Sequence, residues 1–98
     1  MSEPQMNCIH VWVDGRVQGV GFRAFVQDWA IRLELTGWVR NVGDDQVEIW
    51  AEGNQTELDR LFEIVQRGPR SAYVSGVRIE KETPRNSYSR FQVVSSSY

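Results

Sequence analysis

A glycine-rich segment, residues 15–21, separates a strand pattern from a helix pattern and thereby limits the folds open to this chain. The preceding residues 8–14 alternate with a period of two, which indicates a half-buried strand. The following residues 22–35 repeat apolar side chains three, four and seven positions apart, which indicates an amphipathic helix. Because glycine adopts backbone conformations that other residues avoid, the three glycines in this segment predict a tight loop between strand and helix.

The remaining sequence predicts three further strands, the last of them followed by a short extra strand, and a second helix. A hairpin joins the second and third strands through residues 43–46, and Gly68-Pro69 ends the second helix. The order β-α-β-β-α-β with a short extra strand is typical of the ferredoxin-like α+β fold. We therefore expect an antiparallel sheet with two helices on one face and solvent on the other. The expected strands are 38–42, 47–52, 73–82 and 91–94, and the expected helix is about 55–67.

Size and composition favour one small domain. The chain has 98 residues and 41% apolar side chains, which is enough to fold. Cys8 is the only cysteine, so no internal disulfide can form, and we expect a cytoplasmic protein. No segment resembles a secretion signal or a membrane span, so we expect no membrane partner. A net charge of −2 argues against a general nucleic-acid binder, so we expect no nucleic-acid partner. The polar residues 1–7 predict a flexible tail before a single domain over residues 8–98.

The glycine-rich loop has the composition of an anion site. Successive backbone N–H groups of such a loop can point at one anion, and the start of a helix adds unpaired donors and partial positive charge. Arg23 lies in the first turn of the predicted helix, where its guanidinium can bind two phosphate oxygens at once. The same spacing also fits a plain turn, in which Gly15 and Gly19 serve only the backbone and Arg23 pairs with a surface acid. The spacing alone leaves both interpretations open.

The expected topology brings a second polar segment to the same edge of the sheet. In a split βαβ unit the first two strands run in the same direction, with the third inserted antiparallel between them. The end of strand 38–42, with Arg40 and Asn41, therefore lies beside loop 15–21 and the start of the first helix.

Two motifs resemble those of the acylphosphatase family. Residues 15–23, Gly-Arg-Val-Gln-Gly-Val-Gly-Phe-Arg, look like the signature loop of that family, and residues 37–41, Gly-Trp-Val-Arg-Asn, resemble its second motif. The separation of the motifs and the element order also match, and the resemblance spans about residues 9–94. It implies an acylphosphatase-like domain that hydrolyses small acyl phosphates to a carboxylate and inorganic phosphate, and we expect a monomer.

The resemblance also implies a role for each motif residue. Arg23 would bind the phosphate together with the loop backbone, and Asn41 would orient the attacking water through its amide. A carboxylate leaves without a general acid, so positioning and charge stabilisation suffice, and no metal or cofactor is expected. Inorganic phosphate or sulfate should compete for the site. The backbone residues expected to bind phosphate are Val17, Gln18, Gly19, Val20, Gly21 and Phe22.

The sequence departs from the family pattern in turns and caps. Glu34 stands where the family usually has glycine near the end of the first helix. Asp44-Asp45 replaces a frequent Asp-Gly in the hairpin turn, and Arg70 replaces a second proline after Gly68-Pro69. These changes bear on stability and leave Arg23 and Asn41 unaltered.

Other reactive side chains favour structural roles. His10 lies in mid-strand on the face away from the core, and Cys8 has no histidine placed to activate it, so we expect a buried or edge thiol. No group of His, Cys and carboxylate side chains has metal-ligand spacing, and Asp44-Asp45 is more typical of a solvated turn.

Two other functions compete with hydrolysis. The fold also occurs as a segment of larger maturation enzymes that handle carbamoyl phosphate, so a phosphate-sensing module is the second hypothesis. RNA binding is the third, because Trp12 and Trp50 project from the face on which related folds stack bases. Glu48 and Glu52 on that face argue against RNA, and we expect Trp12 and Trp50 to pack against each other across the strands.

Overall fold

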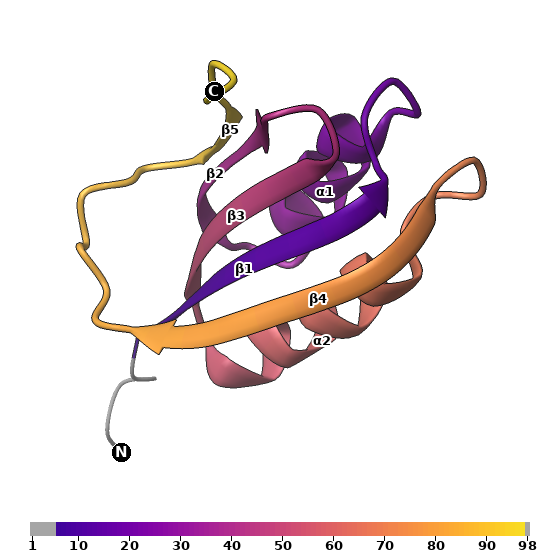
Figure 1. Ribbon diagram of the computed structural model, residues 1–98. Helices are drawn as coiled ribbons and strands as arrows, with labels where there is room; N and C mark the ends of the chain where they lie inside the picture. Colours follow the sequence, from indigo (N-terminus) through magenta and orange to yellow (C-terminus); the bar gives the residue numbers. More distant parts are fainter. Residues whose placement is uncertain (1–5, 98) are drawn as a thin grey trace.

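The strand pattern at the start of the chain forms β1 (Asn7–Arg16), the second strand of a five-stranded sheet with the order β4-β1-β3-β2-β5 (Figure 1). The computed structural model describes residues 6–97, so most of the predicted tail, residues 1–5, lies outside the described residues. Asn7 already belongs to β1. The other elements are α1 (Phe22–Arg32), β2 (Thr36–Val42), β3 (Gln46–Gly53), α2 (Gln55–Arg67), β4 (Tyr73–Glu82) and β5 (Phe91–Val93).

The arrangement confirms the predicted ferredoxin-like fold. Strand β3 pairs antiparallel with both β1 and β2, so β1 and β2 run in the same direction. Both helices lie behind the sheet in Figure 1 and cover one face of it. Their buried side chains meet the apolar face of β1 in one continuous core. The helix residues that contribute to it are Phe22, Val26 and Ala30 from α1, and Leu58, Leu61 and Val65 from α2.

The sheet is mixed rather than wholly antiparallel, because β5 pairs parallel with β2. Strand β4 runs antiparallel to β1, so the last residues of β4 lie at the same end of the sheet as the first residues of β2. Residues 83–90 cross from there to the far side of β2, so the chain enters β5 in the direction of β2 (Figure 1). The expected antiparallel sheet is correct for every pair except this last one.

The sheet face opposite the helices is only partly open to solvent. Residues 83–90 pack over one end of it, where the Nε1 of Trp38 donates a hydrogen bond to the hydroxyl of Tyr88 at 3.1 Å. The backbone N–H of Arg85 donates to a carboxylate oxygen of Glu52 at 2.9 Å. Within the described chain, neither helix has the length and apolar composition needed to span a bilayer.

Helix α1 ends at Arg32, three residues before the predicted end at residue 35. The N–H of Leu35 donates to the carbonyl of Ala30 at 2.9 Å, and that of Glu34 donates to the carbonyl of Ile31 at 3.0 Å. These two bonds form a Schellman motif, which terminates a helix with one residue in the left-handed conformation. Glu34 occupies that position with φ 59°. Leu35 is buried beyond the helix end.

We predict that Glu34→Gly stabilises the protein by about 0.5–1 kcal/mol, because glycine adopts this conformation without the steric cost of a Cβ atom. Urea unfolding of both proteins measures the difference. Glu34→Ala is the matched control, since it removes the carboxylate but keeps the Cβ atom. Equal stabilisation by alanine would assign the effect to charge at the helix end and contradict the backbone explanation.

Candidate active site

The glycines of the first motif serve two different purposes. Strand β1 extends to Arg16, so the loop proper comprises residues 17–21 and begins two residues later than predicted. Gly15 lies in the strand at a bulge in the β1–β4 ladder, with φ 133°, and a Cβ atom there would lie 2.2 Å from the carbonyl oxygen of Tyr73. Gly19 and Gly21 have φ 72° and 78°, and no atom lies within 4 Å of the Cβ position of either. Gly15 therefore shapes the sheet, whereas Gly19 and Gly21 shape an open loop.

The start of α1 presents unpaired donors to this loop. Gly21 is the N-cap residue, and the first intrahelical bond runs from the N–H of Phe25 to its carbonyl at 3.0 Å. Within residues 6–97, no side chain caps this helix end, and its first turn carries no acidic residue. The N–H groups at the helix start are thus left for an external acceptor, which the helix dipole favours when it is an anion.

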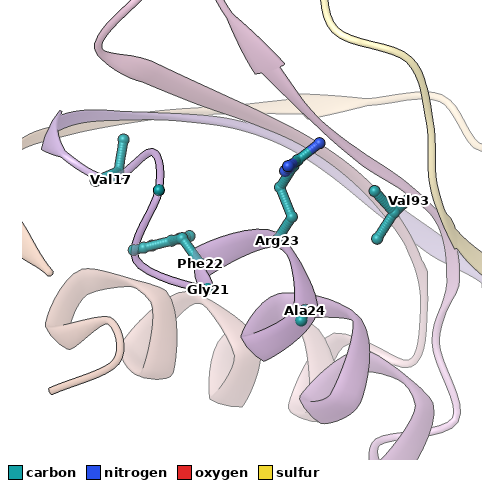
Figure 2. Close-up of a pocket in the computed structure, with 7 residues that line it drawn as sticks. Val17, Gly21, Phe22, Arg23, Ala24 and Val93 are labelled. Carbon is teal, nitrogen blue, oxygen red and sulfur yellow. The ribbon is translucent and has the colours of Figure 1, made fainter. Parts of the chain in front are cut away.

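The loop, the start of α1 and strand β5 enclose a pocket of about 250 Å³. Arg23 rises from the first turn of α1 into the space between the loop and Val93 (Figure 2). No ion pair among the described residues includes Arg23, so the alternative in which it pairs with a surface acid is wrong within residues 6–97. The pocket is lined by Val17, Gly19, Gly21, Phe22, Arg23, Ala24 and Val93.

Two of the predicted loop residues do not line this pocket. Val20 packs against the core, and the side chain of Gln18 turns away toward the β2–β3 hairpin. Its Nε2 atom donates to three backbone carbonyls of that hairpin. Sequence reasoning placed only the backbone of Gln18 in the site, because hydrogen bonds to backbone carbonyls elsewhere in the chain leave no pattern in the sequence.

Asn41 lies near the end of β2 on the face that the helices cover. It pairs with the fully buried Val47 of β3, and directly opposite residues share one face of a sheet. Its backbone carbonyl accepts a hydrogen bond from the N–H of Ser97 at 2.8 Å. Its side-chain Oδ1 atom is buried and accepts no hydrogen bond from the described residues. A buried acceptor without a donor costs about 1–3 kcal/mol, so this oxygen is suited to bind a water or a ligand hydroxyl.

His10 belongs to a network on the opposite face of the sheet. Its Nε2 lies 2.7 Å from Oε2 of Glu48, whose Oε1 accepts a hydrogen bond from Nε of Arg40 at 2.7 Å. The predicted packing of Trp12 against Trp50 is wrong in register, because His10 lies opposite Trp50 and Trp12 lies opposite Glu48. The His10 ring fills the intervening space, with its centroid 3.8 Å from that of Trp12.

The same face offers little to RNA bases, because arginine side chains already cover its tryptophan rings. The guanidinium of Arg78 lies 4.0 Å from the centre of the Trp12 ring. That of Arg85 lies 4.3 Å from the centre of the Trp50 ring. A base could stack on either ring only after it had displaced a cation that stabilises the ring.

Cys8 is buried at the start of β1, as expected of a structural thiol. The pKa of the Cys8 thiol is raised to about 12, first by burial and then by the carboxylates of Glu52 and Glu82, while Arg85 opposes the rise. A thiol with such a pKa is protonated at neutral pH and is a poor nucleophile. The described part of the chain contains no group of three or more His, Cys, Asp or Glu side chains that could hold a metal ion.

We predict that Cys8 of the native protein reacts with iodoacetamide at pH 8 at least about 100-fold more slowly than in urea, because burial suppresses the thiolate. Mass spectrometry of samples quenched at intervals measures both rates. Comparable rates in native and unfolded protein would show that the thiol is accessible and ionised, which contradicts the burial described above.

Comparison with known proteins gives one consistent answer. The family model described as Acylphosphatase matches residues 9–93. A curated acylphosphatase from Pseudomonas paraeruginosa is 51% identical over 73 residues, which cover 74% of this chain and 80% of the relative. The solved structure of an acylphosphatase from Coxiella burnetii superposes with a TM-score of 0.89 at 41% identity, covering 96% of this chain and 100% of that one. Full-length HypF, in a phosphate- and nucleotide-bound crystal structure, matches 98% of this chain at 26% identity with a TM-score of 0.89, but only 13% of HypF is covered.

Proposed function

The chain belongs to the acylphosphatase family of hydrolases, and on that basis we propose that the pocket at the start of α1 binds the phosphoryl group of a small acyl phosphate. The observation that carries this proposal is the position of Arg23, which lies in a pocket with the glycine loop and the unpaired donors of α1. Because Arg23 has no acidic partner in the described chain, its charge is available to a phosphate.

The phosphoryl oxygens bind to the guanidinium of Arg23 and to backbone N–H groups of residues 17–22. Such donors are fixed by the fold before the substrate arrives, so they stabilise the charge on the transferring group without reorganisation. Glycine at positions 19 and 21 leaves room beside the backbone, since a Cβ atom at either position would point into open space.

Asn41 holds the attacking water. Its buried Oδ1 accepts one hydrogen of the water, which leaves an oxygen lone pair directed at the phosphorus. As the new P–O bond forms, the bond between phosphorus and the acyl oxygen breaks, and the carboxylate leaves with the electron pair. A phosphate oxygen of the substrate takes the proton of the water. Among the described residues the only histidine, His10, faces the opposite side of the sheet, so it plays no part as a base.

The substrate is recognised mainly by its phosphoryl group, because the pocket of about 250 Å³ leaves little room for specific contacts to the acyl group. Inorganic phosphate and sulfate carry the same oxygens and charge, so they compete for the site. We further propose that the protein acts as a monomer and without a nucleic-acid partner.

We predict that Arg23→Ala lowers kcat/KM for benzoyl phosphate by about 10²–10³-fold, as expected when a charged donor to the transition state is removed. Phosphate should also inhibit this variant less strongly. Arg32→Ala is the matched control, because Arg32 lies in the same helix but contacts the exposed Asp28 and the ring of Trp29 and does not line the pocket. If Arg23→Ala and Arg32→Ala hydrolyse benzoyl phosphate equally fast, Arg23 does not bind the substrate.

We predict that Asn41→Ala lowers kcat by about 10²-fold or more and leaves inhibition by inorganic phosphate nearly unchanged, because water positioning acts on the reaction step rather than on binding. Steady-state assays with and without phosphate separate the two effects. A variant with normal kcat would refute the role of Asn41. If the unaltered protein binds phosphate but hydrolyses no acyl phosphate, it is a phosphate-sensing module instead.

A further inference from the structure

We propose that the side chain of Gln18 is a positioning residue for this reaction. It ties the phosphate-binding loop to the end of β2 and so fixes the direction from which the water on Asn41 meets the phosphorus. The inference rests on the proposed function, because it concerns the alignment of the two halves of that site.

The hydrogen bonds of Gln18 reach three carbonyls of one hairpin. Its Nε2 lies 3.0 Å from the carbonyl oxygens of Gly43 and Gln46, and 3.3 Å from that of Val42. A side-chain amide has two N–H hydrogens, so each of the two shorter contacts takes one hydrogen and the longer contact is shared. These acceptors occupy both strand ends of the β2–β3 hairpin and the turn between them.

These contacts join the two halves of the proposed site. Gln18 stands between Val17 and Gly19, which line the phosphate pocket, while its acceptor Val42 follows Asn41 directly in the chain. Along the backbone, the same two halves are separated by the whole of α1, the turn after it and most of β2. The Gln18 amide is therefore a direct side-chain link between the part that holds phosphate and the part that holds water.

The loop needs such a link more than β2 does. The end of β2 is already held on its other side, where the carbonyl of Asn41 and the N–H of Gly43 bond to the backbone of Ser97, each at 2.8 Å. The loop contains two glycines with positive φ and open surroundings, so its own backbone resists displacement only weakly. Without the amide, we expect the loop to shift relative to Asn41.

Such a shift affects the reaction more than it affects binding. Arg23 and the N–H groups of the loop move together with a bound phosphate, so phosphate binding survives a change in the position of the loop. Attack in line with the breaking bond depends on the water as well, and a misplacement of about 1 Å costs about 10²-fold in rate. The inference therefore predicts a loss in kcat with little change in phosphate affinity.

Gln18→Met tests this, because methionine has a similar length and shape but donates no hydrogen bond. We expect kcat for benzoyl phosphate to fall by about 10–100-fold, with the inhibition constant for inorganic phosphate within about threefold of the unaltered protein. Gln66→Met is the matched control, since the Gln66 amide bonds only within α2, to the carbonyl of Phe62, and its loss should leave both constants unchanged. If Gln18→Met does not fold, Gln18→Asn serves instead, because its side chain keeps the amide but is too short to reach the hairpin. We expect the same fall in kcat with a nearly unchanged inhibition constant for phosphate.

A double variant identifies the residue through which Gln18 acts. If Gln18 serves only to align Asn41, adding Gln18→Met to Asn41→Ala should lower kcat by less than about threefold further. Full additivity of the two losses would overturn the inference. So would an inhibition constant that rises by the same factor by which kcat falls, because Gln18 would then shape only the phosphate loop.

The experiment separates this inference from the proposed function. If Asn41→Ala hydrolyses benzoyl phosphate at the normal kcat, the proposed role of Asn41 fails, and the inference fails with it. If Asn41→Ala is impaired while Gln18→Met keeps a normal kcat, the proposed function stands and only the role of Gln18 is overturned.

Discussion

The pairing of β3 between β1 and β2 is the constraint on which the candidate site depends. Because β3 is antiparallel to both neighbours, β1 and β2 end at the same edge of the sheet. The loop after β1 and Asn41 of β2 lie at that edge without any long insertion, whereas Arg40, predicted beside the loop as well, lies on the opposite face and bonds to Glu48. Helix α1, which must cross back over the sheet, begins at this edge and adds its unpaired N–H groups. A chain of 98 residues thus builds a site from segments that its topology already places together.

Among residues 6–97, the buried carboxylates have partners of their own and none of them pairs with Arg23. On the face away from the helices, the buried carboxylate of Glu48 is bonded to Arg40 and His10. The carboxylate of Glu52 accepts hydrogen bonds from the indole of Trp50 and from backbone N–H groups of residues 85 and 86. Buried carboxylates need such partners, because an unpaired charge in the interior is costly. Arg23 has no acidic neighbour among residues 6–97, which suits a group whose partner is an anion from solution.

Elements could be predicted from the sequence wherever the pattern was local. The bounds of α2 and β4 agree with those predicted from the apolar spacing, because the buried face of each element fixes which positions are apolar. The Gly68-Pro69 stop marks the end of α2. The end of α1 was predicted too late, because the helix was expected to continue to the Thr36-Gly37 break, although the backbone has already left the helix at Glu34. Glycine or asparagine usually occupies this left-handed position, so the glutamate gave no local stop signal.

The sequence by itself determined the order of the elements, the glycine loop and the arginine at the start of α1, because these depend on the preferences of neighbouring residues. Only the tertiary structure decided which glycine serves which purpose, since Gly15 is required by the close approach of Tyr73 on β4. It also decided that β5 lies parallel to β2 and that His10, rather than a second tryptophan, fills the space beside Trp12. The hydrogen bonds of Gln18 are likewise features that only the tertiary structure decided. They join residues 24 to 28 positions apart, and such contacts arise only from the way the strands pair in space.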